Sequence, residues 1–399
     1  MAQPDNEAIP VYLDHAATTP MRPEAVEATL PFLSGAFGNA SGTHAVARAA
    51  KTALESSREV VASALGVTPA EVVFTSGGTE ADNLAVKGAA WAARSQGTGD
   101  GIVTTTFEHH AVLHSCDRLE RDGFRVARTR VTPDGIVDLD ALADALDERT
   151  VIVSVMLVNN EVGTIQPLDD VAELVRERAP RALLHTDAVQ AMPWIDVAGA
   201  ASHADLVAIA AHKFGGPKGV GALVVRRSAT SRVTPLLDGG GHERGLRSGT
   251  YNVAGIAGMA AAMTILGDNR KKEVERAAAL RDRLVAGLAA MPSPLATFNG
   301  DPARKVAGNC HVRFPGVEAE ALLLMLDRDG IYAAAGSACQ SGSMDPSHVL
   351  MAMGMRKEDA LSSIRLSLGW CSTDADVDIA LDVIPRAVES LRQLSSRRR

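Results

Sequence analysis

The sequence contains little cysteine and few aromatic residues. Four cysteines, Cys116, Cys310, Cys339 and Cys371, stand among 399 residues, and aromatic residues make up 4% of the chain. No two cysteines form a Cys-x-x-Cys pair and none has zinc-finger spacing with histidine, so we predict no metal site. So few cysteines also exclude a disulfide framework and indicate a reducing compartment, and we therefore predict a cytoplasmic protein.

The sequence also lacks long apolar runs and an excess of positive charge. No apolar run approaches the ~20 residues that a helix needs to cross a bilayer, and the polar segment 1–10 has no signal-peptide pattern. Lys and Arg total 40 against 48 Asp and Glu, a net charge of −8. This mildly acidic balance argues against a direct nucleic-acid partner or a membrane partner. The function is therefore expected to lie in local motifs.

What the chain does have is a regular alternation of strands and helices. At ~150 residues per domain, its length predicts two or three domains, or one large and one small. Short β-branched runs predict seven strands, at 71–74, 101–106, 124–130, 150–158, 182–185, 205–210 and 221–225. Ala-rich patterns predict helices after several of them, at 80–94, 111–121, 139–146 and 171–178. This alternation predicts an α/β fold with a mostly parallel seven-stranded sheet, in which ligands bind at the carboxyl ends of the strands.

The pattern changes after Gly249. The remaining chain predicts helices at 253–291, 318–329 and 376–394, and strands at 310–314 and 364–368. Such a mixture is typical of a smaller α+β domain. We therefore predict a large domain at 20–260, and a small domain made of 1–19 and 261–399 that carries Cys339.

Three motifs at predicted strand ends indicate a cofactor site. The segment Thr75–Glu80 is rich in glycine and opens a helix, where backbone N–H groups can bind a phosphate; an ordinary turn with a Thr N-cap is the alternative. Asp187 and Lys213 follow successive strands, 26 residues apart. Pyridoxal phosphate (PLP) needs a lysine that holds it covalently and an acid that keeps its ring nitrogen protonated. Together the three motifs meet the requirements of a PLP site.

Three other residues are candidates whose local sequence leaves alternatives open. His109 follows a strand and could stack on an aromatic cofactor and move protons, or simply cap a helix. Arg365 stands in an apolar strand, where it either binds a substrate carboxylate or forms a structural ion pair. Cys339 lies in a segment of small residues, 333–343, that is typical of a functional loop. The other three cysteines better fit inert, buried thiols.

Taken together, these motifs resemble those of the NifS/IscS-type cysteine desulfurases, within the fold-type I, class V aminotransferase superfamily. The matching stretches run almost end to end, at 12–20, 37–39, 78–83, 158–163, 239–244 and 247–250. The resemblance implies the PLP-dependent transferase fold type I. It also implies a homodimer with PLP as cofactor and L-cysteine as substrate.

The resemblance further implies roles for single residues. Those implied for the PLP ring are Lys213 as its covalent anchor, Asp187 at the ring nitrogen, Asn160 and Gln190 at the ring substituents, and His109 stacked on the ring and helping in proton transfer. Those implied for the phosphate are Gly78, Thr79, His212 and, from the second subunit, Thr250. Those implied for the substrate are Arg365, helped by Asn39, at the carboxylate, and Cys339 as the nucleophile.

The chain departs from the family pattern at two places. The family commonly has Ser-Gly before His-Lys, with the Ser binding phosphate, and Ala210 and Ala211 stand there instead. One phosphate hydrogen bond is thus missing, which predicts a slightly weaker affinity for the cofactor. The C-terminus is short and Arg-rich, which leaves the identity of the sulfur acceptor open.

The predicted activity is removal of sulfur from L-cysteine, which gives L-alanine and a persulfide on Cys339. The persulfide sulfur is expected to pass to an acceptor protein, such as an iron–sulfur scaffold or a tRNA thiolase. Selenocysteine lyase, another class V PLP aminotransferase and an inactive docking scaffold are the alternatives. An aminotransferase has no need for a thiol on a loop, so Cys339 argues against that alternative.

Overall fold

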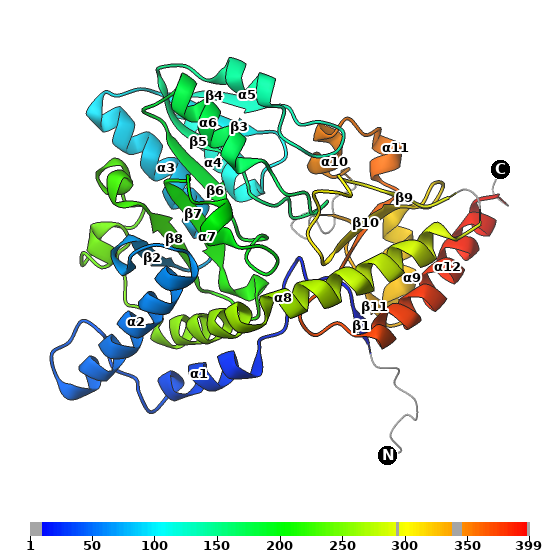
Figure 1. The fold of residues 1–399 in the computed structure, drawn as a ribbon, viewed down its shortest axis with the longest axis horizontal. Helices are drawn as coiled ribbons and strands as arrows, with labels where there is room; N and C mark the ends of the chain where they lie inside the picture. Colours follow the sequence, from blue (N-terminus) through cyan, green and yellow to red (C-terminus); the bar gives the residue numbers. More distant parts are fainter. Residues whose placement is uncertain (1–9, 293–294, 337–344, 397–399) are drawn as a thin grey trace.

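A seven-stranded sheet forms the centre of the larger part of the molecule in the computed structural model, which describes residues 10–292, 295–336 and 345–396 (Figure 1). The strand order is β2-β8-β7-β6-β5-β3-β4. The strands are β2 (Val72–Thr75), β3 (Gly101–Thr105), β4 (Arg125–Thr129), β5 (Thr150–Ser154), β6 (Leu183–Asp187), β7 (Leu206–Ala210) and β8 (Gly221–Val225). Strand β8 runs antiparallel to β2 and β7, and the other pairs are parallel. The predicted mostly parallel, seven-stranded sheet is therefore confirmed.

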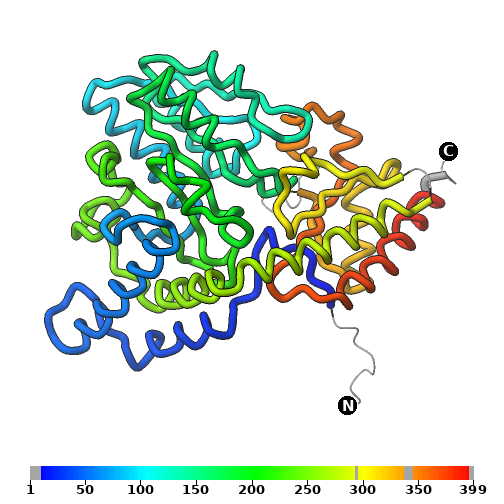
Figure 2. Tube along the Cα trace, in the orientation of Figure 1, coloured from blue at the N-terminus to red at the C-terminus, as the bar shows by residue number. Residues whose placement is uncertain are grey.

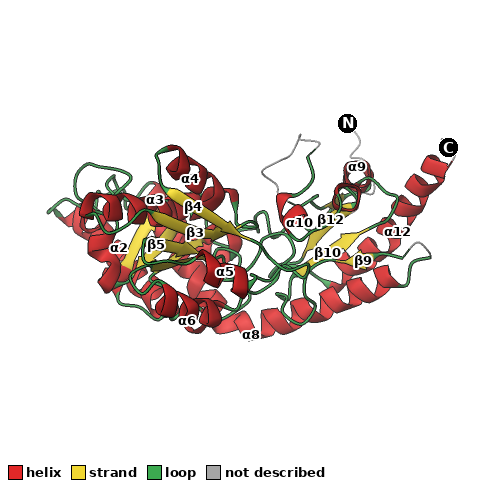
Figure 3. Ribbon diagram, turned by 90° about the horizontal axis from the view of Figure 1, so that it is seen from above, coloured by secondary structure: helices red, strands yellow, loops and turns green. Residues whose placement is uncertain are grey.

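Helices cover both faces of this sheet, as Figure 3 shows. One face packs against α3 (Gly78–Gln96) and α4 (His110–Arg121). The other face packs against α2 (Ala45–Ala64), α5 (Leu139–Ala145), α6 (Leu168–Arg178) and α7 (Val197–Ala200). Successive strand residues alternate between the two cores, so Val73 packs on the α3 side while Val72 and Phe74 pack on the other. Because both faces are buried, the central strands are continuous apolar runs.

Two smaller sheets lie beside the large one and share a separate hydrophobic core (Figure 2). The first contains β9 (Thr297–Phe298), β10 (Asn309–Arg313) and β12 (Ser363–Ser367), and the second pairs β1 (Val11–Tyr12) with β11 (Ile331–Tyr332). The helices of this region are α9 (Ala319–Arg328), α10 (His348–Ala352), α11 (Lys357–Ala360) and α12 (Asp374–Ser396). The N-terminal strand thus joins the C-terminal part of the chain, as the predicted small domain requires.

One long helix, α8 (Val253–Ala289), connects the two parts (Figure 1). It packs against α1 (Pro23–Leu33) and α2 along its first half. Ile256 and Leu266 belong to a core of the large sheet, whereas Leu280 and Leu288 belong to the core of the small sheets. The predicted division at residue 260 therefore falls inside a continuous helix, and the domain limits stay a prediction.

Candidate active site

Nine of the predicted site residues line one cavity of about 250 Å³. They are Gly78, Thr79, His109, Asn160, Asp187, Gln190, His212, Lys213 and Arg365. All but Arg365 come from segments that follow the carboxyl ends of β2, β3, β5, β6 and β7. Because these strands are parallel, their carboxyl ends meet at one edge of the sheet, which brings distant parts of the sequence together. The fold thus supports the predicted grouping, while the roles stay predictions.

Lys213 lies in the turn Ala211–Lys213 that follows β7, and its amine is held at the cavity wall. Its Nζ donates hydrogen bonds to the carbonyl oxygens of Ala16 and Ala17, over 2.7 and 2.8 Å. The Gln190 side chain donates to the same Ala16 oxygen over 2.7 Å. The N-terminal segment therefore positions the Lys213 amine, a function that the sequence motifs did not reveal.

Asp187 ends β6 inside the cavity and is 5% exposed. Its Oδ1 accepts a hydrogen bond from Val189 N over 2.9 Å. Burial raises the pKa of the Asp187 carboxyl to about 6, although that hydrogen bond and the charge of Lys213 act in the opposite direction. The Asp187 carboxylate is therefore ionised at neutral pH and available to a cationic partner.

His109 caps the N-terminus of α4, where its Nδ1 accepts a hydrogen bond from Ala111 N over 3.1 Å. The interpretation as a helix cap is therefore confirmed. The ring also lines the cavity, and its stacking on a cofactor stays a prediction. Burial and then the charge of Lys213 lower the pKa of His109 to about 4. The ring is therefore neutral at neutral pH, and its flat face can stack on an aromatic ligand.

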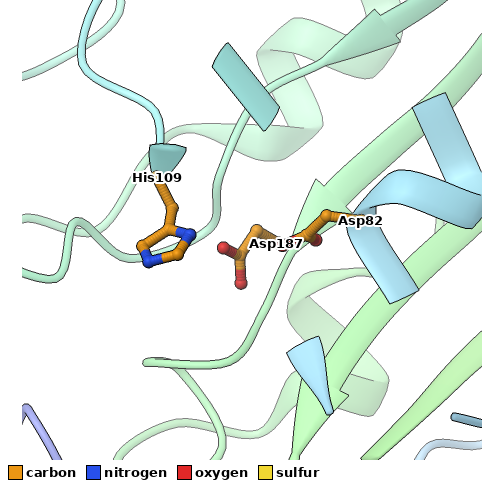
Figure 4. Close-up of side chains that lie close together, drawn as sticks. All are labelled: Asp82, His109 and Asp187. Carbon is orange, nitrogen blue, oxygen red and sulfur yellow. The ribbon is translucent and has the colours of Figure 1, made fainter. Parts of the chain in front are cut away.

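A buried acid, Asp82, stands close to these two residues, as Figure 4 shows. Asp82, His109 and Asp187 each have a side-chain atom of a type that can bind a metal ion, and these three atoms lie within 4.8 Å of one another. Among the described residues, no other set of three such side chains is this close. Lys213 lines the same cavity. Asp82 lies in the matching stretch 78–83, but the sequence analysis assigned no role to it. The available signal was its apolar surroundings, since Ala81, Ala85 and Val86 of α3 are buried with it.

The motif predicted to bind phosphate opens a 19-residue helix, α3, which begins at Gly78. A Cβ at Gly78 would lie 2.8 Å from Cγ2 of Val189, so only glycine fits here without a shift. Backbone N–H groups of a first helical turn have no partner inside the helix and favour an anion. His212 lies beside this end of the cavity, with Nδ1 3.2 Å from Oγ1 of Thr18, and burial lowers its pKa to about 4.

Arg365 reaches the cavity from β12 of the small sheet and is 1% exposed. Its Nη1 donates to the backbone oxygen of Asn160 and its Nη2 to Oδ1 of Asp14, each over 2.8 Å. Nε finds no hydrogen-bond partner in the part of the chain that the structure describes. The contact with Asp14 is an ion pair, as the structural alternative for Arg365 requires. The Nε–H group remains able to donate a hydrogen bond to a ligand.

Asn39 and Thr250, also predicted at the site, are exposed and do not line this cavity. Their loops lie together, because His242 connects them. Its Nε2 is 3.0 Å from Oγ of Ser41, and its Nδ1 accepts from Gly249 N over 3.3 Å. For Thr250 this placement agrees with the predicted action in a second subunit. For Asn39, predicted to assist Arg365, the role stays a prediction.

The described cysteines differ from one another in burial. Cys116 and Cys310 are buried, and burial raises the pKa of each thiol to about 12, which confirms the interpretation of inert core residues. Cys371 is exposed, so that interpretation is wrong for it. The reason is that Cys371 lies in the connection between β12 and α12, at the surface of the small part. Cys339 lies outside the described residues, and its role stays a prediction.

Comparisons with known proteins agree with this fold and site. Residues 11–380 match the family described as aminotransferase class-V. The chain is 46% identical over 386 residues to an IscS-like cysteine desulfurase of Mycobacterium tuberculosis, covering 96% of this chain and 97% of that protein. It is 42% identical to the cysteine desulfurase IscS of Clostridium botulinum, covering 96% of each chain. The solved structure of a NifS-like protein superposes with a TM-score of 0.89 at 36% identity, covering 96% of this chain and 100% of that one.

The fold and these matches place the chain in the aminotransferase class-V family, with the PLP fold type I. Within that class, the chain belongs to the family of the IscS- and NifS-type cysteine desulfurases. The chain is therefore an enzyme of this family, and enzymes of the family depend on PLP.

Proposed function

We propose that this chain removes sulfur from free L-cysteine with PLP as its cofactor, and that Cys339 receives the sulfur. The observation that carries the proposal is the convergence of Lys213, Asp187 and Arg365 on one cavity. An amine, a buried carboxylate and a guanidinium in one enclosed space match the requirements of a PLP enzyme that acts on an amino acid.

The residues of the cavity fit PLP in their chemistry. Oδ1 of Asn160 is buried and has no hydrogen-bond partner among the described residues, so it can accept a hydrogen bond from a group bound in the cavity. Asp187 suits a protonated ring nitrogen, and the N–H groups at the start of α3 suit a phosphate. When bound, PLP supplies an electron sink that makes the Cα proton of the amino acid acidic and its C–S bond easier to break.

In this proposal each side chain of the cavity binds the substrate or moves a proton. Arg365 binds the substrate carboxylate through its guanidinium, Lys213 Nζ takes the Cα proton, and neutral His109 holds the ring face and passes protons. The Cys339 thiolate attacks the substrate sulfur, so an S–S bond forms as the C–S bond breaks. In sum, L-cysteine and the Cys339 thiol give L-alanine and the Cys339 persulfide, and no external oxidant is needed.

The experiment that tests this function uses the purified full chain with PLP and L-cysteine. We expect L-alanine to form together with an equal amount of sulfide when a thiol reductant releases the persulfide. Parallel assays with L-selenocysteine test the closest alternative. Activity with selenocysteine alone would identify a lyase for that amino acid, and amino-group transfer to a keto acid would identify an aminotransferase.

Ala210 provides a test of the phosphate end of the cavity. It lines the cavity, and its Cβ lies 3.6 Å from the position of a Cβ on Gly78. An Ala210→Ser variant is expected to bind PLP about tenfold more tightly, because its hydroxyl adds a hydrogen bond to a charged phosphate. The dissociation constant of PLP for the cofactor-free chain measures this effect. Ala211→Ser is the matched control, since Ala211 does not line the cavity; equal affinities of wild type and Ala210→Ser would contradict the assignment.

We also propose that the active enzyme is a homodimer. Leu30, Leu33 and Phe37, in and after α1, are 55%, 65% and 75% exposed, an unusual concentration of large apolar side chains on a surface. Asn39 is exposed and follows Phe37 by two residues in the sequence. The exposed loop of Thr250 is connected to the loop of Asn39 through His242. The homodimer is therefore supported by two features. One is the apolar surface that a second copy can cover, and the other is Thr250, which does not line the cavity of its own chain.

A mixed-dimer experiment tests whether Thr250 acts on the cavity of the partner. The variants are Lys213→Ala, and Thr250→Glu, whose carboxylate repels a phosphate. If Thr250 acts across the interface, mixing them restores about half of the wild-type activity, because one site then has both native residues. If Thr250 acts within its own chain, mixing restores nothing. The assay is alanine formation after the two variants are co-expressed with different tags and purified through both.

The acceptor of the persulfide sulfur and the location of the protein remain parts of the proposal. We propose an acceptor protein of iron–sulfur cluster assembly or of tRNA thiolation. In the described ranges of the chain, no helix has the length and apolar character to span a membrane. A cytoplasmic location is supported by the cysteine composition. A persulfide-transfer assay against candidate acceptors is the measurement that distinguishes them.

A further inference from the structure

Asp82 stands next to Asp187 and has no part in the proposed reaction. It lies in the second turn of α3 and is 1% exposed. Its carboxyl group belongs to the group of atoms within 4.8 Å that includes a ring nitrogen of His109 and a carboxylate oxygen of Asp187 (Figure 4). Its Oδ1 makes no hydrogen bond to any described residue. Two buried carboxyl groups so close together cannot both ionise without a compensating positive charge.

His185 is placed to stabilise an ionised Asp82. It precedes Asp187 by two residues on β6, so both side chains lie on the same face of the strand. Its Nε2 lies 3.5 Å from Oδ1 of Asp82, and its Nδ1 lies 2.8 Å from Oγ of Ser154. Burial lowers the pKa of His185 to about 3, so the ring is neutral. When the Ser154 hydroxyl donates to Nδ1, the remaining ring proton is on Nε2 and faces Asp82.

The titratable groups around this pair come from three parts of the fold. They are Glu108 and His109 between β3 and α4, His185 on β6, and Lys213 after β7. Burial, followed by the charges of Asp187 and Glu108, raises the pKa of Asp82 well above its ordinary value. Burial also raises the pKa of Glu108 to about 8 and that of Asp187 to about 6. Burial and the neighbouring acids therefore favour the protonated form of Asp82, whereas the charge of Lys213 favours the ionised form of Asp187.

We propose that Asp82 is a positioning residue that balances the charge of the cofactor site. It holds a proton while the site lacks the cofactor, and releases this proton to solvent when the protonated ring nitrogen of PLP is placed against Asp187. This inference rests on the proposed PLP function. A cation beside two carboxyl groups favours the ionised form of both, and the His185 N–H stabilises the second charge. The second charge then helps Asp187 to keep the ring nitrogen protonated.

The test counts the protons that are released when a cofactor analogue binds. The full chain, freed of cofactor, is titrated near neutral pH with pyridoxine 5′-phosphate, which has no aldehyde and cannot react with Lys213. Calorimetry in buffers of different ionisation enthalpy gives the number of protons released per bound molecule. We expect the wild type to release up to about one proton more than Asp82→Asn. A purely structural Asp82 would change the affinity and leave the proton count unaltered, which would overturn the proposal.

Glu108→Gln is the matched control, because Glu108 is another buried acid of the same cluster. Its Oε1 already accepts hydrogen bonds from Thr105 Oγ1 and Met156 N, over 2.7 and 2.9 Å. We expect Glu108→Gln to keep most of the wild-type proton release. If this variant loses the released proton and Asp82→Asn keeps it, the proton belongs to Glu108 and the proposal is wrong.

An infrared measurement on the wild type keeps the test decisive if Asp82→Asn does not fold. The C=O absorption of buried protonated carboxyl groups should decrease when pyridoxine 5′-phosphate binds. The same decrease should occur in Glu108→Gln, because Glu108, with a pKa of about 8, is the other buried acid of the cluster that is protonated near neutral pH. An unchanged band would overturn the proposal for Asp82. The proposed PLP function and the proposed role of Asp82 can be tested separately, because failure of the analogue to bind would overturn the cofactor function as well. Binding without proton release would overturn the assignment of Asp82 alone.

Discussion

Replacement of Lys213 by alanine is expected to lower the rate of alanine formation from cysteine by about 10³-fold or more. The Lys213 amine is fixed at the cavity by the carbonyl oxygens of Ala16 and Ala17, at 2.7 and 2.8 Å. Alanine at position 213 removes both the covalent anchor of PLP and the base that takes the Cα proton. The measurements are alanine production and the visible absorption band of the lysine-bound cofactor, and both should be lost.

Lys218→Ala is the matched control for Lys213→Ala. Lys218 lies five residues later in the same connection between β7 and β8 and is exposed. Its replacement is expected to leave the absorption band in place and the rate within a factor of about two, since exposed side chains contribute little. Activity of Lys213→Ala within tenfold of the wild type would refute the role of Lys213.

Replacement of Cys339 by alanine is expected to abolish sulfur transfer while PLP stays bound. Only a thiolate attacks the substrate sulfur, and alanine has no nucleophilic atom, so the rate of alanine formation should fall by about 10³-fold or more. The absorption band of the bound cofactor should be unchanged, because the described residues that line the cavity are all retained. The assay is alanine formation from cysteine, followed by detection of persulfide on the protein by thiol-specific labelling.

Cys371→Ala is the control for Cys339→Ala, because Cys371 is the exposed cysteine among the described residues. The control should retain both alanine formation and persulfide labelling. Full activity of Cys339→Ala would refute the role of Cys339, and loss of the persulfide from Cys371→Ala would place the sulfur-accepting thiol at Cys371. The contrast between these two variants therefore decides which cysteine carries the sulfur.

The sheet was predictable because its strands are buried on both faces. Each of the seven predicted strands overlaps an observed strand, and the predicted helix at 253–291 corresponds to α8 at Val253–Ala289. The short elements were harder to predict. Strand β1 (Val11–Tyr12) has two residues and forms only because it pairs with β11, about 320 residues away in the chain. Such a segment has too few residues for a periodic pattern.

The sequence by itself determined that Asp187, Lys213 and the start of α3 meet at one sheet edge, because parallel strands place their carboxyl ends together. Only the tertiary structure decided three further points. It placed Asp82 beside Asp187, brought Arg365 from a second sheet to the backbone of Asn160, and kept Thr250 away from the cavity of its own chain. The physical reason is that these contacts depend on how separate elements pack, and a single sequence carries no periodic signal for packing between distant residues.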